Sequence, residues 1–493
     1  MRRGPEARAW ALLAAAVAAL TLIRLWALTV NATDLYVDEA QYWAWAQSPA
    51  WGYYSKPPLL AWLIAGAQTI CGTSEACVRA PSPILWGLTC LVVAAIARTL
   101  FDLRVAVWAG LCALLAPGVA YAARIISTDA PLLFFWALAV LAWVRLRAGG
   151  GWGWTALLAV AFGLGLLSKY AMIYLLGGLA VAAVVDPAGR RALTGARVWP
   201  GLALGAVLIA PNLVWNARHD FATLRHTADN AAGSGLAIDP GGALAFLAAQ
   251  FGLAGPVVFG AVLLATWRAA RSPALTAARP LLALSVPLWL ALTAMALVTE
   301  VNANWAAPAL IAAFVLAPAV LLTMRFGRGF LLGGLAFGLL IQALLLLADP
   351  RARSLTMGGE PVYGRTVGWA EFADAVADRA EAEGLSAVVA ERRSEVVALI
   401  YYGRDRPLEV RAWPPSPGAA PRDHFEMSRP LTGGPVLAVS ACDDPARFQG
   451  WSRVAGLGPV DVFAGAGATR RFHLFRLEGS AGRIRPPSPC PGG

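Results

Sequence analysis

Long apolar stretches recur along the first 348 residues of this 493-residue chain. A helix needs about 20 such residues to cross the hydrocarbon core of a bilayer, so each stretch is a candidate membrane span. The pattern predicts eleven spans, at 10–30, 82–100, 105–122, 130–146, 152–168, 170–185, 198–215, 242–267, 280–298, 304–324 and 329–348. The first stretch is too long and wrongly flanked for a cleaved signal peptide, and it is therefore predicted to be retained.

Basic residues give these spans an orientation. With the N-terminus in the cytoplasm, the inner loops hold fifteen arginines, and the outer loops of the membrane part hold six lysines and arginines. This bias satisfies the positive-inside rule and, with an odd number of spans, places everything after about residue 349 outside. The net charge of +11 is therefore mainly an orientation signal. A nucleic-acid partner would need the basic residues gathered on one soluble face, so none is expected.

The remaining residues, 349–493, are polar and contain no further apolar span. Their periodicity predicts a small α/β domain with parallel strands and helical crossovers. The predicted helices are 369–384 and 394–403, and the predicted strands are 386–391, 408–413 and 434–441. We therefore divide the chain into a membrane domain, residues 1–348, and an outer soluble domain, residues 349–493.

Acidic residues and long loops favour the outer face as the place of the chemistry. In this topology nine acids of the membrane part fall outside and three fall inside. The outer loops 31–81 and 216–241 are long, and the first is rich in aromatic residues. An enzyme that works at the outer surface of a membrane needs such loops to cover its substrates.

The six cysteines fall into pairs along the chain. Cys71 and Cys77 flank a short outer segment, and we predict a bridge between them because outer cysteines pair in an oxidising compartment; the alternative is two free thiols. Cys442 and Cys490 lie in the outer domain, and the other two cysteines sit in predicted spans. No pair has the spacing of a zinc site, and the four histidines are scattered.

The first outer loop opens with YVDEAQYWAWAQ, residues 36–47, in which Asp38 and Glu39 are adjacent. The segment has helical spacing, and its aromatic residues suit an interfacial helix lying along the membrane. The helix dipole favours acids in a first turn, and this alone would explain the pair. The functional interpretation is that Asp38 is a general base, partly desolvated by its aromatic neighbours, that takes a proton from an acceptor hydroxyl.

Both lysines of the chain, Lys56 and Lys169, fall at the outer interface, whereas the other 38 basic residues are arginines. A lysine is a compact point charge that suits the phosphate of a lipid, although snorkelling toward headgroups would also explain its position. In GYYSKPPLL, residues 52–60, two prolines hold Lys56 on a stiff corner. Tyr53 and Tyr54 beside it are able to donate hydroxyls or stack on a sugar.

Two further outer segments carry charge. Arg124 and Asp129 lie in a turn between spans, and the alternatives are a surface ion pair or a second cation for a phosphate, oriented by the acid. Arg225 and His226 lie in the second long loop, and NANWAAP, residues 302–308, offers amides. The sequence contains no Gly-rich phosphate loop, DxD pair or nucleotide-binding fingerprint, so a nucleotide sugar is not the expected donor.

Taken together, these motifs resemble a known family. DLYVDEAQYWAWAQ, WGYYSKPPLLAWLIA and CVRAPSPI, followed in order by ARIISTDAPLLFFWALA, GLGLLSKYAM, PNLVWNARHDF and ANWAAPA, are similar to bacterial transferases related to protein O-mannosyltransferases and to the lipid A aminoarabinose transferase. These proteins are GT-C membrane glycosyltransferases. The resemblance extends from residue 1 to about residue 325.

The resemblance implies that a sugar passes, with inversion, from a polyprenyl-phosphate donor to a cell-envelope acceptor, such as lipid A, the core oligosaccharide of lipopolysaccharide, another polysaccharide or a protein. It implies that Asp38 activates the acceptor, with Glu39 beside it, and that Lys56 contacts the lipid phosphate. Further positions that match the same face are Arg124, Asp129, Lys169 and, loosely, Arg225. Aminoarabinose transferases have a glutamate near a bound metal where this chain has Ser55, so no cofactor is expected and a divalent metal is doubtful.

We therefore predict a glycosyltransferase of the bacterial inner membrane with a GT-C fold, about eleven spans and an outer α/β domain. The N-terminus is expected in the cytoplasm, and the active site and the C-terminal domain are expected in the periplasm. The alternatives are a polyprenyl-linked glycan ligase or polymerase and a lipid-linked sugar transporter. A transporter needs ionisable residues near the bilayer midplane, whereas here they crowd one face, with Arg24 as the main exception, and Arg24 is able to snorkel.

Overall fold

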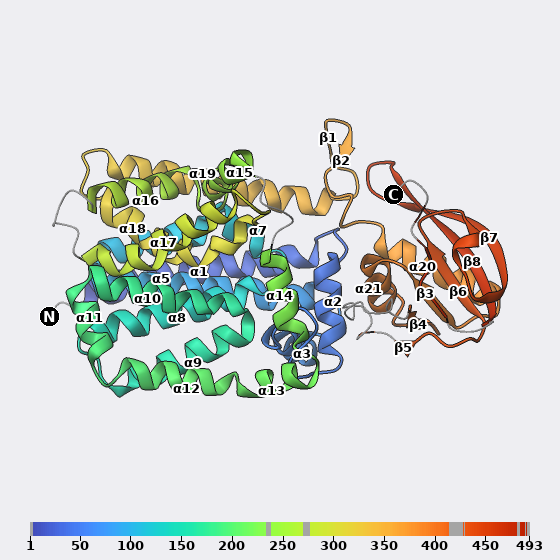
Figure 1. Cartoon of the computed structure of the whole chain (residues 1–493). Helices are drawn as coiled ribbons and strands as arrows, with labels where there is room; N and C mark the ends of the chain where they lie inside the picture. Colours follow the sequence, from blue (N-terminus) through green and yellow to red (C-terminus); the bar gives the residue numbers. More distant parts are fainter. Residues whose placement is uncertain are drawn as a thin grey trace. The chain divides into compact units, whose positions relative to one another are not determined.

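The computed structural model describes residues 3–232, 238–269, 277–413, 427, 429–480, 484–488 and 490 (Figure 1). Its contacts divide the chain into two compact units, a membrane unit and a sheet unit. The membrane unit comprises Met1–Thr29, Lys56–Leu60 and Arg79–Leu346, and the sheet unit comprises Val30–Ser55, Ala61–Val78 and Leu347–Gly493. The last boundary lies beside the expected one at 348/349. The first outer loop, in contrast, groups mostly with the C-terminal residues, which our division of the sequence did not anticipate.

The membrane unit is made of helices (Figure 1). In chain order they are α1 (Arg3–Thr29), α5 (Pro81–Leu100), α6 (Leu103–Leu115), α7 (Pro117–Ala122), α8 (Asp129–Arg147), α9 (Trp152–Ser168), η1 (Tyr170–Ile173), α10 (Tyr174–Val185), α11 (Pro187–Thr194), α12 (Val198–Leu208), α13 (Ala210–Arg218), α14 (Ala222–Ala232), α15 (Pro240–Ala254), α16 (Pro256–Ala269), α17 (Arg279–Met295), η3 (Ala303–Ala306), α18 (Ala307–Leu321) and α19 (Gly327–Ala348). Among the described residues, six helices are long and apolar enough to cross a membrane, or up to eight if each of two bent pairs forms one span. A polytopic helical membrane protein is therefore confirmed, and the number eleven stays a prediction.

One predicted span is wrong in shape. Residues 242–267 belong to two helices, α15 and α16, which are bent by 115° at Gly255. Gly255 has a φ of 85°, a left-handed conformation that L side chains rarely adopt, and Pro256 cannot continue the preceding helix. The Gly-Pro pair therefore ends one helix and starts another in a new direction. A second bend, of 117°, separates α10 from α11 on either side of Asp186.

Helix α18 forms the centre of the membrane unit. Every residue of Ala307–Leu321 is buried, and the helix packs against α5, α6, α8, α16 and α17. A helix that is apolar on all sides is expected to be enclosed in this way. Small residues bring other helices close together. A Cβ placed on Gly338 of α19 would lie 1.8 Å from the carbonyl oxygen of Leu115, so only glycine permits this approach to α6.

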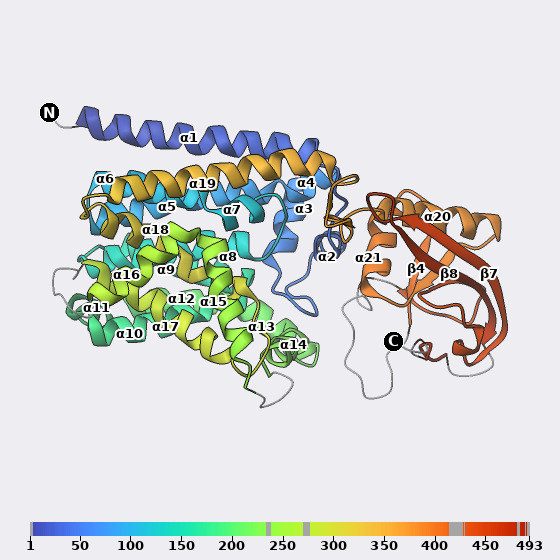
Figure 2. The ribbon, with the colours of Figure 1, turned by 90° about the horizontal axis from the view of Figure 1, so that it is seen from above.

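Helices α1 and α19 run along each other in the view of Figure 2. A buried arginine of α1 joins the two helices. The Arg24 side chain is buried, with 4% of the residue exposed. Its Nε donates to Gln342 Oε1 at 2.9 Å, and its Nη2 donates to the carbonyl oxygen of Leu114 at 2.9 Å. The expectation that Arg24 snorkels is therefore wrong. Its guanidinium instead joins three helices through hydrogen bonds that are strong in an apolar setting.

The sheet unit contains a six-stranded sheet with the strand order β5-β4-β3-β6-β8-β7. The elements of this unit are α2 (Val37–Ala46), most of α3 (Leu59–Cys71) and α4 (Glu75–Arg79), β1 (Thr356–Met357), β2 (Glu360–Pro361), α20 (Trp369–Ala382), β3 (Ala387–Ala390), α21 (Arg393–Tyr402), β4 (Glu409–Ala412), β5 (Arg429–Pro430), β6 (Val436–Ser440), β7 (Trp451–Phe463) and β8 (Thr469–Ser480). Strand β3 pairs in parallel with β4 and β6, which confirms the predicted arrangement of helices and strands. The long antiparallel hairpin of β7 and β8 was not predicted.

The central strands of the sheet are buried on both faces. On one face Val388 belongs to a core cluster with Phe372 of α20 and Leu399 of α21. On the other face Val389 packs in a cluster with Trp413 and Phe448. Successive side chains of a strand point to opposite faces, so strands covered on both sides read as continuous apolar runs.

Two disulfides close loops of the sheet unit. The predicted Cys71–Cys77 bridge is present, and a second bridge joins Cys442 to Cys490. The remaining cysteines, Cys90 of α5 and Cys112 of α6, are buried free thiols, as their positions in predicted spans indicate.

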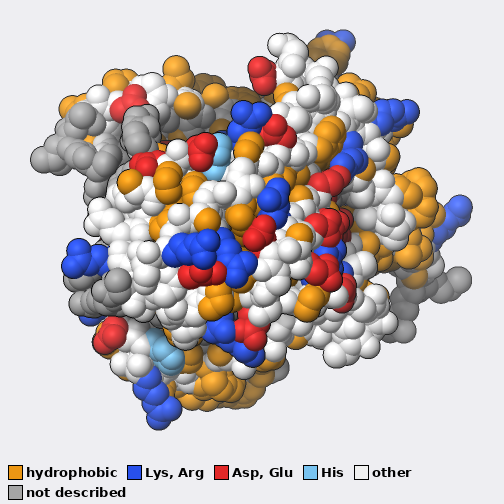
Figure 3. Space-filling view, turned by 90° about the vertical axis from the view of Figure 1, so that its right-hand side faces the viewer, with side chains coloured by type: hydrophobic (Ala, Val, Ile, Leu, Met, Phe, Trp, Pro, Cys, Tyr) orange, Lys and Arg blue, Asp and Glu red, His pale blue; other side chains and the backbone are white. Residues whose placement is uncertain are grey.

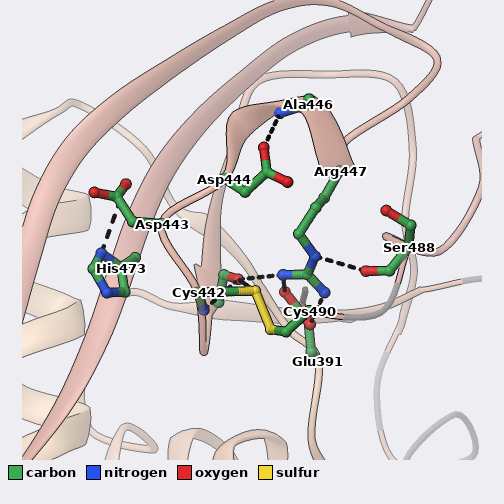
Figure 4. Close-up of a disulfide and its surroundings, with 10 residues drawn as sticks. Glu391, Cys442, Asp443, Asp444, Ala446, Arg447, His473, Ser488 and Cys490 are labelled. Carbon is green, nitrogen blue, oxygen red and sulfur yellow. Dashed lines mark hydrogen bonds and ion pairs between the residues drawn. A yellow bond between two sulfur atoms is a disulfide. The ribbon is translucent and has the colours of Figure 1, made fainter. Parts of the chain in front are cut away.

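A buried arginine stands beside the second bridge (Figure 4). The Arg447 side chain is 3% exposed, and its Nη1 and Nη2 donate to the two carboxylate oxygens of Glu391 at 3.0 and 2.7 Å. Its Nε donates to the carbonyl oxygen of Ser488 at 2.6 Å, and Nη1 also donates to Ser440 Oγ at 2.6 Å. A buried ion pair is stable when its other donors are satisfied, as they are here. Arg447 therefore ties the ends of β3 and β6 to the C-terminal tail.

Charged side chains on the sheet unit are largely paired with one another. On the hairpin, Arg471 binds both carboxylate oxygens of Asp461 at 2.7 Å, and Arg476 Nε lies 2.6 Å from Glu478 Oε1. Figure 3 shows one face of the molecule on which basic and acidic side chains are interspersed. Each exposed pair contributes about 0–1 kcal/mol, so these pairs set the surface charge pattern more than the stability.

Candidate active site

In the membrane unit, side chains from two distant segments meet at Asp129. This residue is the first of α8, where the helix dipole favours a carboxylate. Lys169 Nζ donates to its Oδ1 at 2.7 Å, and Asn304 Nδ2 donates to its Oδ2 at 2.7 Å. Lys169 directly follows α9, and Asn304 lies in η3. The cation that the structure places on Asp129 is thus Lys169, whereas the sequence interpretation paired this acid with Arg124.

The Lys169–Asp129 pair is only partly shielded from solvent. The Lys169 side chain is 22% exposed, and that of Asp129 is 12% exposed. An ammonium group has three donors, and in the described part of the chain one of them binds a side chain, that of Asp129, so the others are available to an anion. The arrangement therefore holds an amine in a fixed position at the end of α9.

The other cationic candidates of the membrane unit lie on separate elements. The guanidinium carbon of Arg124, in the turn after α7, lies 5.5 Å from the centre of the Tyr121 ring. Lys56 is half-buried in the corner that precedes α3. Arg225 is exposed on α14, and residues 233–237 of the same predicted loop lie outside the described residues.

In the sheet unit, Asp38 forms an ion pair with an arginine that we did not single out in the sequence. Asp38 lies in the first turn of α2, and Arg393 is the first residue of α21. Arg393 Nη1 lies 2.7 Å from Asp38 Oδ1, and the same nitrogen donates to Gln41 Oε1. The two side chains are 36% and 44% exposed, for Arg393 and Asp38 respectively. The predicted base is therefore open to solvent and oriented by a cation.

Glu39 is placed differently from its neighbour. It is 2% exposed, and its Oε2 accepts a hydrogen bond from the backbone N–H of Tyr36 at 2.9 Å. An acid three residues after the N-cap commonly satisfies the backbone in this way. The geometry gives Glu39 a role in starting α2, and its contact with substrate stays a prediction.

The aromatic residues of the first loop are inside the protein. Trp43 and Trp45 are each 4% exposed, so they pack inside the protein, and an interfacial helix lying along the membrane stays a prediction. Trp43 packs edge-on against Tyr401 of α21, with ring centres 4.8 Å apart. Tyr53 stacks on Trp45, and its hydroxyl donates to the Trp45 carbonyl oxygen at 3.1 Å. Tyr53 thus holds the loop together, whereas Tyr54 is half-buried.

Two further acids of the sheet unit are buried, and burial raises the pKa of each. The carboxylate of Asp34 accepts a hydrogen bond from Trp369 N at 2.6 Å, and desolvation raises its pKa to about 6. Glu395 of α21 accepts from Arg392 N at 3.1 Å, and desolvation raises its pKa to about 7. Nothing in the local sequence distinguishes these acids from exposed ones, so sequence analysis missed them.

A metal site was doubtful from the sequence. In the described part of the chain, no group of three or more His, Cys, Asp or Glu side chains is placed to hold a metal ion. Ser55, which stands where aminoarabinose transferases have a glutamate, is buried. Independence from metal remains a prediction.

The sequence of this chain is similar to a family of glycosyltransferases and to a curated bacterial transferase. Residues 55–215 match the family described as dolichyl-phosphate-mannose-protein mannosyltransferase. The lipid A galacturonosyltransferase RgtD of Rhizobium johnstonii is 33% identical over 455 residues, which cover 89% of this chain and 94% of that protein.

Solved structures of ArnT from Cupriavidus metallidurans share the fold. The undecaprenyl-phosphate-bound form matches with a TM-score of 0.65 at 16% identity, and covers 94% of this chain and 97% of that chain. The apo form matches with a TM-score of 0.64 at 18% identity, and covers 95% and 98% of the two chains.

Proposed function

We propose, since this chain belongs to the superfamily of GT-C membrane glycosyltransferases related to protein O-mannosyltransferases and ArnT, that it transfers a galacturonosyl residue from a polyprenyl-phosphate donor to lipid A. The relationship to RgtD, which spans 94% of that lipid A galacturonosyltransferase, carries the proposal. Relatives that are transferases favour transfer over the alternatives of a transporter or a ligase. The donor class is supported by ArnT, whose matching structure holds undecaprenyl phosphate.

The reaction is an inverting displacement on the periplasmic side of the bacterial inner membrane. An acceptor hydroxyl oxygen of lipid A attacks the anomeric carbon, and the bond from that carbon to the phosphate oxygen breaks. The polyprenyl phosphate leaves with the bonding electron pair, and Asp38 takes the acceptor proton as general base. The distribution of fifteen inner and six outer basic residues supports this orientation, with the N-terminus in the cytoplasm.

Positive charge is needed where negative charge develops on the leaving phosphate. Lys169, held by Asp129 and Asn304, supplies a preorganised ammonium group. Lys56 and Arg124 supply further cations. A polyprenyl phosphate leaves as a stable anion, so the reaction requires no metal, and a chelator is expected to leave transfer unchanged.

The test uses purified full-length protein with lipid A and three separate donors: polyprenyl phosphates carrying galacturonic acid, aminoarabinose or mannose. Mass spectrometry is expected to show one added galacturonosyl residue per acceptor with the first donor only. Asp38→Asn is expected to abolish transfer and retain donor binding, whereas Asp405→Asn, at an acid whose side chain is 85% exposed in the same unit, leaves transfer intact. Transfer from another donor alone would refute the assigned sugar, and full turnover by Asp38→Asn would remove the base.

A further inference from the structure

A basic cavity lies in the membrane unit, away from every residue assigned to the reaction. It has a volume of about 510 Å³ and is lined by the end of α8, the start of α9, helix α11 and the start of α12. The charged residues in its lining are Arg147, Arg191 and Arg197, and none of its lining residues is acidic. The charged residues that border the cavity are therefore all cationic.

Only one of these arginines is neutralised. Arg147 Nη2 binds Asp186 Oδ1 at 2.9 Å, and its Nε binds the other oxygen of the same carboxylate. Arg197 Nη1 instead donates to the carbonyl oxygens of Gly149 and Gly150, at 3.3 and 3.1 Å. These contacts fix the guanidinium and leave its charge in place. Arg191 is exposed on α11, and within the described residues no carboxylate pairs with it or with Arg197.

The surroundings of the cavity have the character of a membrane interface. Trp152 lines the cavity, and Trp199 of α12 directly follows the lining residue Val198; each tryptophan is 59% exposed. Exposed tryptophans concentrate at the headgroup level of bilayers. Helix α11 turns by 117° from α10 and carries two arginines in eight residues, as a short helix lying in the interface would. An anionic lipid headgroup would meet both the aromatic rim and the arginines here.

The cavity is at the far end of the membrane unit from the Asp129 cluster. Helix α8 begins at Asp129 and ends at Arg147, and α9 begins at Trp152 and ends beside Lys169. The 19 residues of α8 extend about 28 Å at 1.5 Å per residue, which matches the thickness of a hydrocarbon core. With the orientation proposed above, the cavity is at the cytoplasmic leaflet. It is thus separate from the place where the transfer reaction is proposed to occur.

We propose that this cavity binds the phosphate group of an anionic phospholipid of the cytoplasmic leaflet, with Arg191 and Arg197 as its cations. Basic pockets between membrane helices on the cytoplasmic side bind such headgroups. The open, tryptophan-rimmed form favours a membrane lipid over free phosphate, because the acyl chains remain in the bilayer while the headgroup enters. The binding does not depend on which sugar the enzyme transfers.

The test measures lipid binding to purified full-length protein by native mass spectrometry in neutral detergent. The probes are phosphatidylglycerol, phosphatidylcholine, undecaprenyl phosphate and inorganic phosphate. Phosphatidylglycerol is expected to bind, and Arg191→Gln/Arg197→Gln is expected to weaken it about 30-fold, the effect of two surface cations on an anionic lipid. The matched control, Arg268→Gln/Arg328→Gln, removes two inner-loop arginines outside the cavity lining and is expected to bind as the wild type does.

A second variant separates loss of lipid binding from loss of folding. It is needed because Arg197 also binds two backbone carbonyl oxygens, so its substitution could disturb the fold. Arg191→Gln alone changes an exposed side chain, and it is expected to weaken phosphatidylglycerol about 5-fold without changing the melting temperature. Equal binding of phosphatidylcholine, or unchanged binding in both variants, overturns the site. Stronger competition by undecaprenyl phosphate or by inorganic phosphate overturns the assignment of a phospholipid. If the protein binds phosphatidylglycerol but does not transfer a galacturonosyl residue, the proposed function is refuted and the lipid site is not.

Discussion

Arg393 offers the sharpest test of how the candidate base is positioned. Its ion pair with Asp38 has both side chains more than a third exposed, so solvent screens it, and Arg393→Ala is expected to cost about 0.2–1 kcal/mol in stability. The catalytic cost should be larger. A general base contributes about 10²–10⁴-fold to a rate, and a carboxylate that has lost its orienting cation keeps only part of this. We expect kcat to fall about 10–100-fold, with KM for the donor almost unchanged.

The assay follows transfer to lipid A at saturating donor and acceptor. Arg393→Lys keeps the charge but loses the guanidinium group whose Nη1 donates to both Asp38 and Gln41, so it should recover turnover only in part. Arg392→Ala is the matched control, because it removes the adjacent exposed arginine. If Arg393 acts through Asp38, then Asp38→Asn/Arg393→Ala should lose no more activity than Asp38→Asn alone. Wild-type turnover in Arg393→Ala, or losses that multiply in the double variant, would refute the positioning role.

Three further predictions concern charge and burial. First, Lys169→Ala should weaken binding of undecaprenyl phosphate about 10–100-fold in a titration, because a charge-assisted hydrogen bond to the phosphate is lost. The double variant Lys169→Ala/Asp129→Asn should regain stability but not affinity for undecaprenyl phosphate. Unchanged affinity in Lys169→Ala would contradict the role of Lys169 in phosphate binding. Second, the raised pKa values of Asp34, about 6, and Glu395, about 7, mean that the folded state binds protons more tightly than the unfolded chain. Stability should therefore fall as the pH rises from about 4 to about 7, by about 3 kcal/mol per group, and thermal melts should show a smaller fall in Asp34→Asn. Third, Arg447→Ala should destabilise the protein by about 3–5 kcal/mol, because Glu391 is left as an unpaired, largely buried charge; a loss below about 1 kcal/mol in denaturant titrations would count against the buried pair.

The parts of the fold that follow from local periodicity could be predicted from the sequence. Helix α20 and strand β3 each carry an unbroken pattern, so their positions agree with the structure to within a few residues. The hairpin of β7 and β8 was missed because Gly456, Gly458 and Pro459 interrupt β7, and most of its side chains are exposed or only partly buried. The bend at Gly255 was visible as a Gly-Pro pair, but the apolar run through it dominated the interpretation.

The sequence predicted which residues belong to the candidate site, but it did not predict which of them form hydrogen bonds and ion pairs with one another. Asp38, Asp129 and Lys169 stand out because acids and lysines are rare in so apolar a chain. Their partners cannot be found locally, since 355 residues separate Arg393 from Asp38 and 175 separate Asn304 from Asp129. The burial of Trp43 likewise depends on Tyr401, a contact that no local pattern encodes.

The grouping of the first loop with the C-terminal domain has a consequence for biogenesis. Asp34 N donates to the carbonyl oxygen of Thr366 at 2.7 Å, and Tyr401 donates its hydroxyl hydrogen to the carbonyl oxygen of Thr73 at 2.8 Å. A ribosome makes the loop early and these partners several hundred residues later. The segment that carries Asp38 therefore cannot form these contacts until almost the whole polypeptide has been made. A nascent chain released before that point would carry the base without the arginine that orients it, so that only completed molecules acquire an assembled Asp38–Arg393 pair.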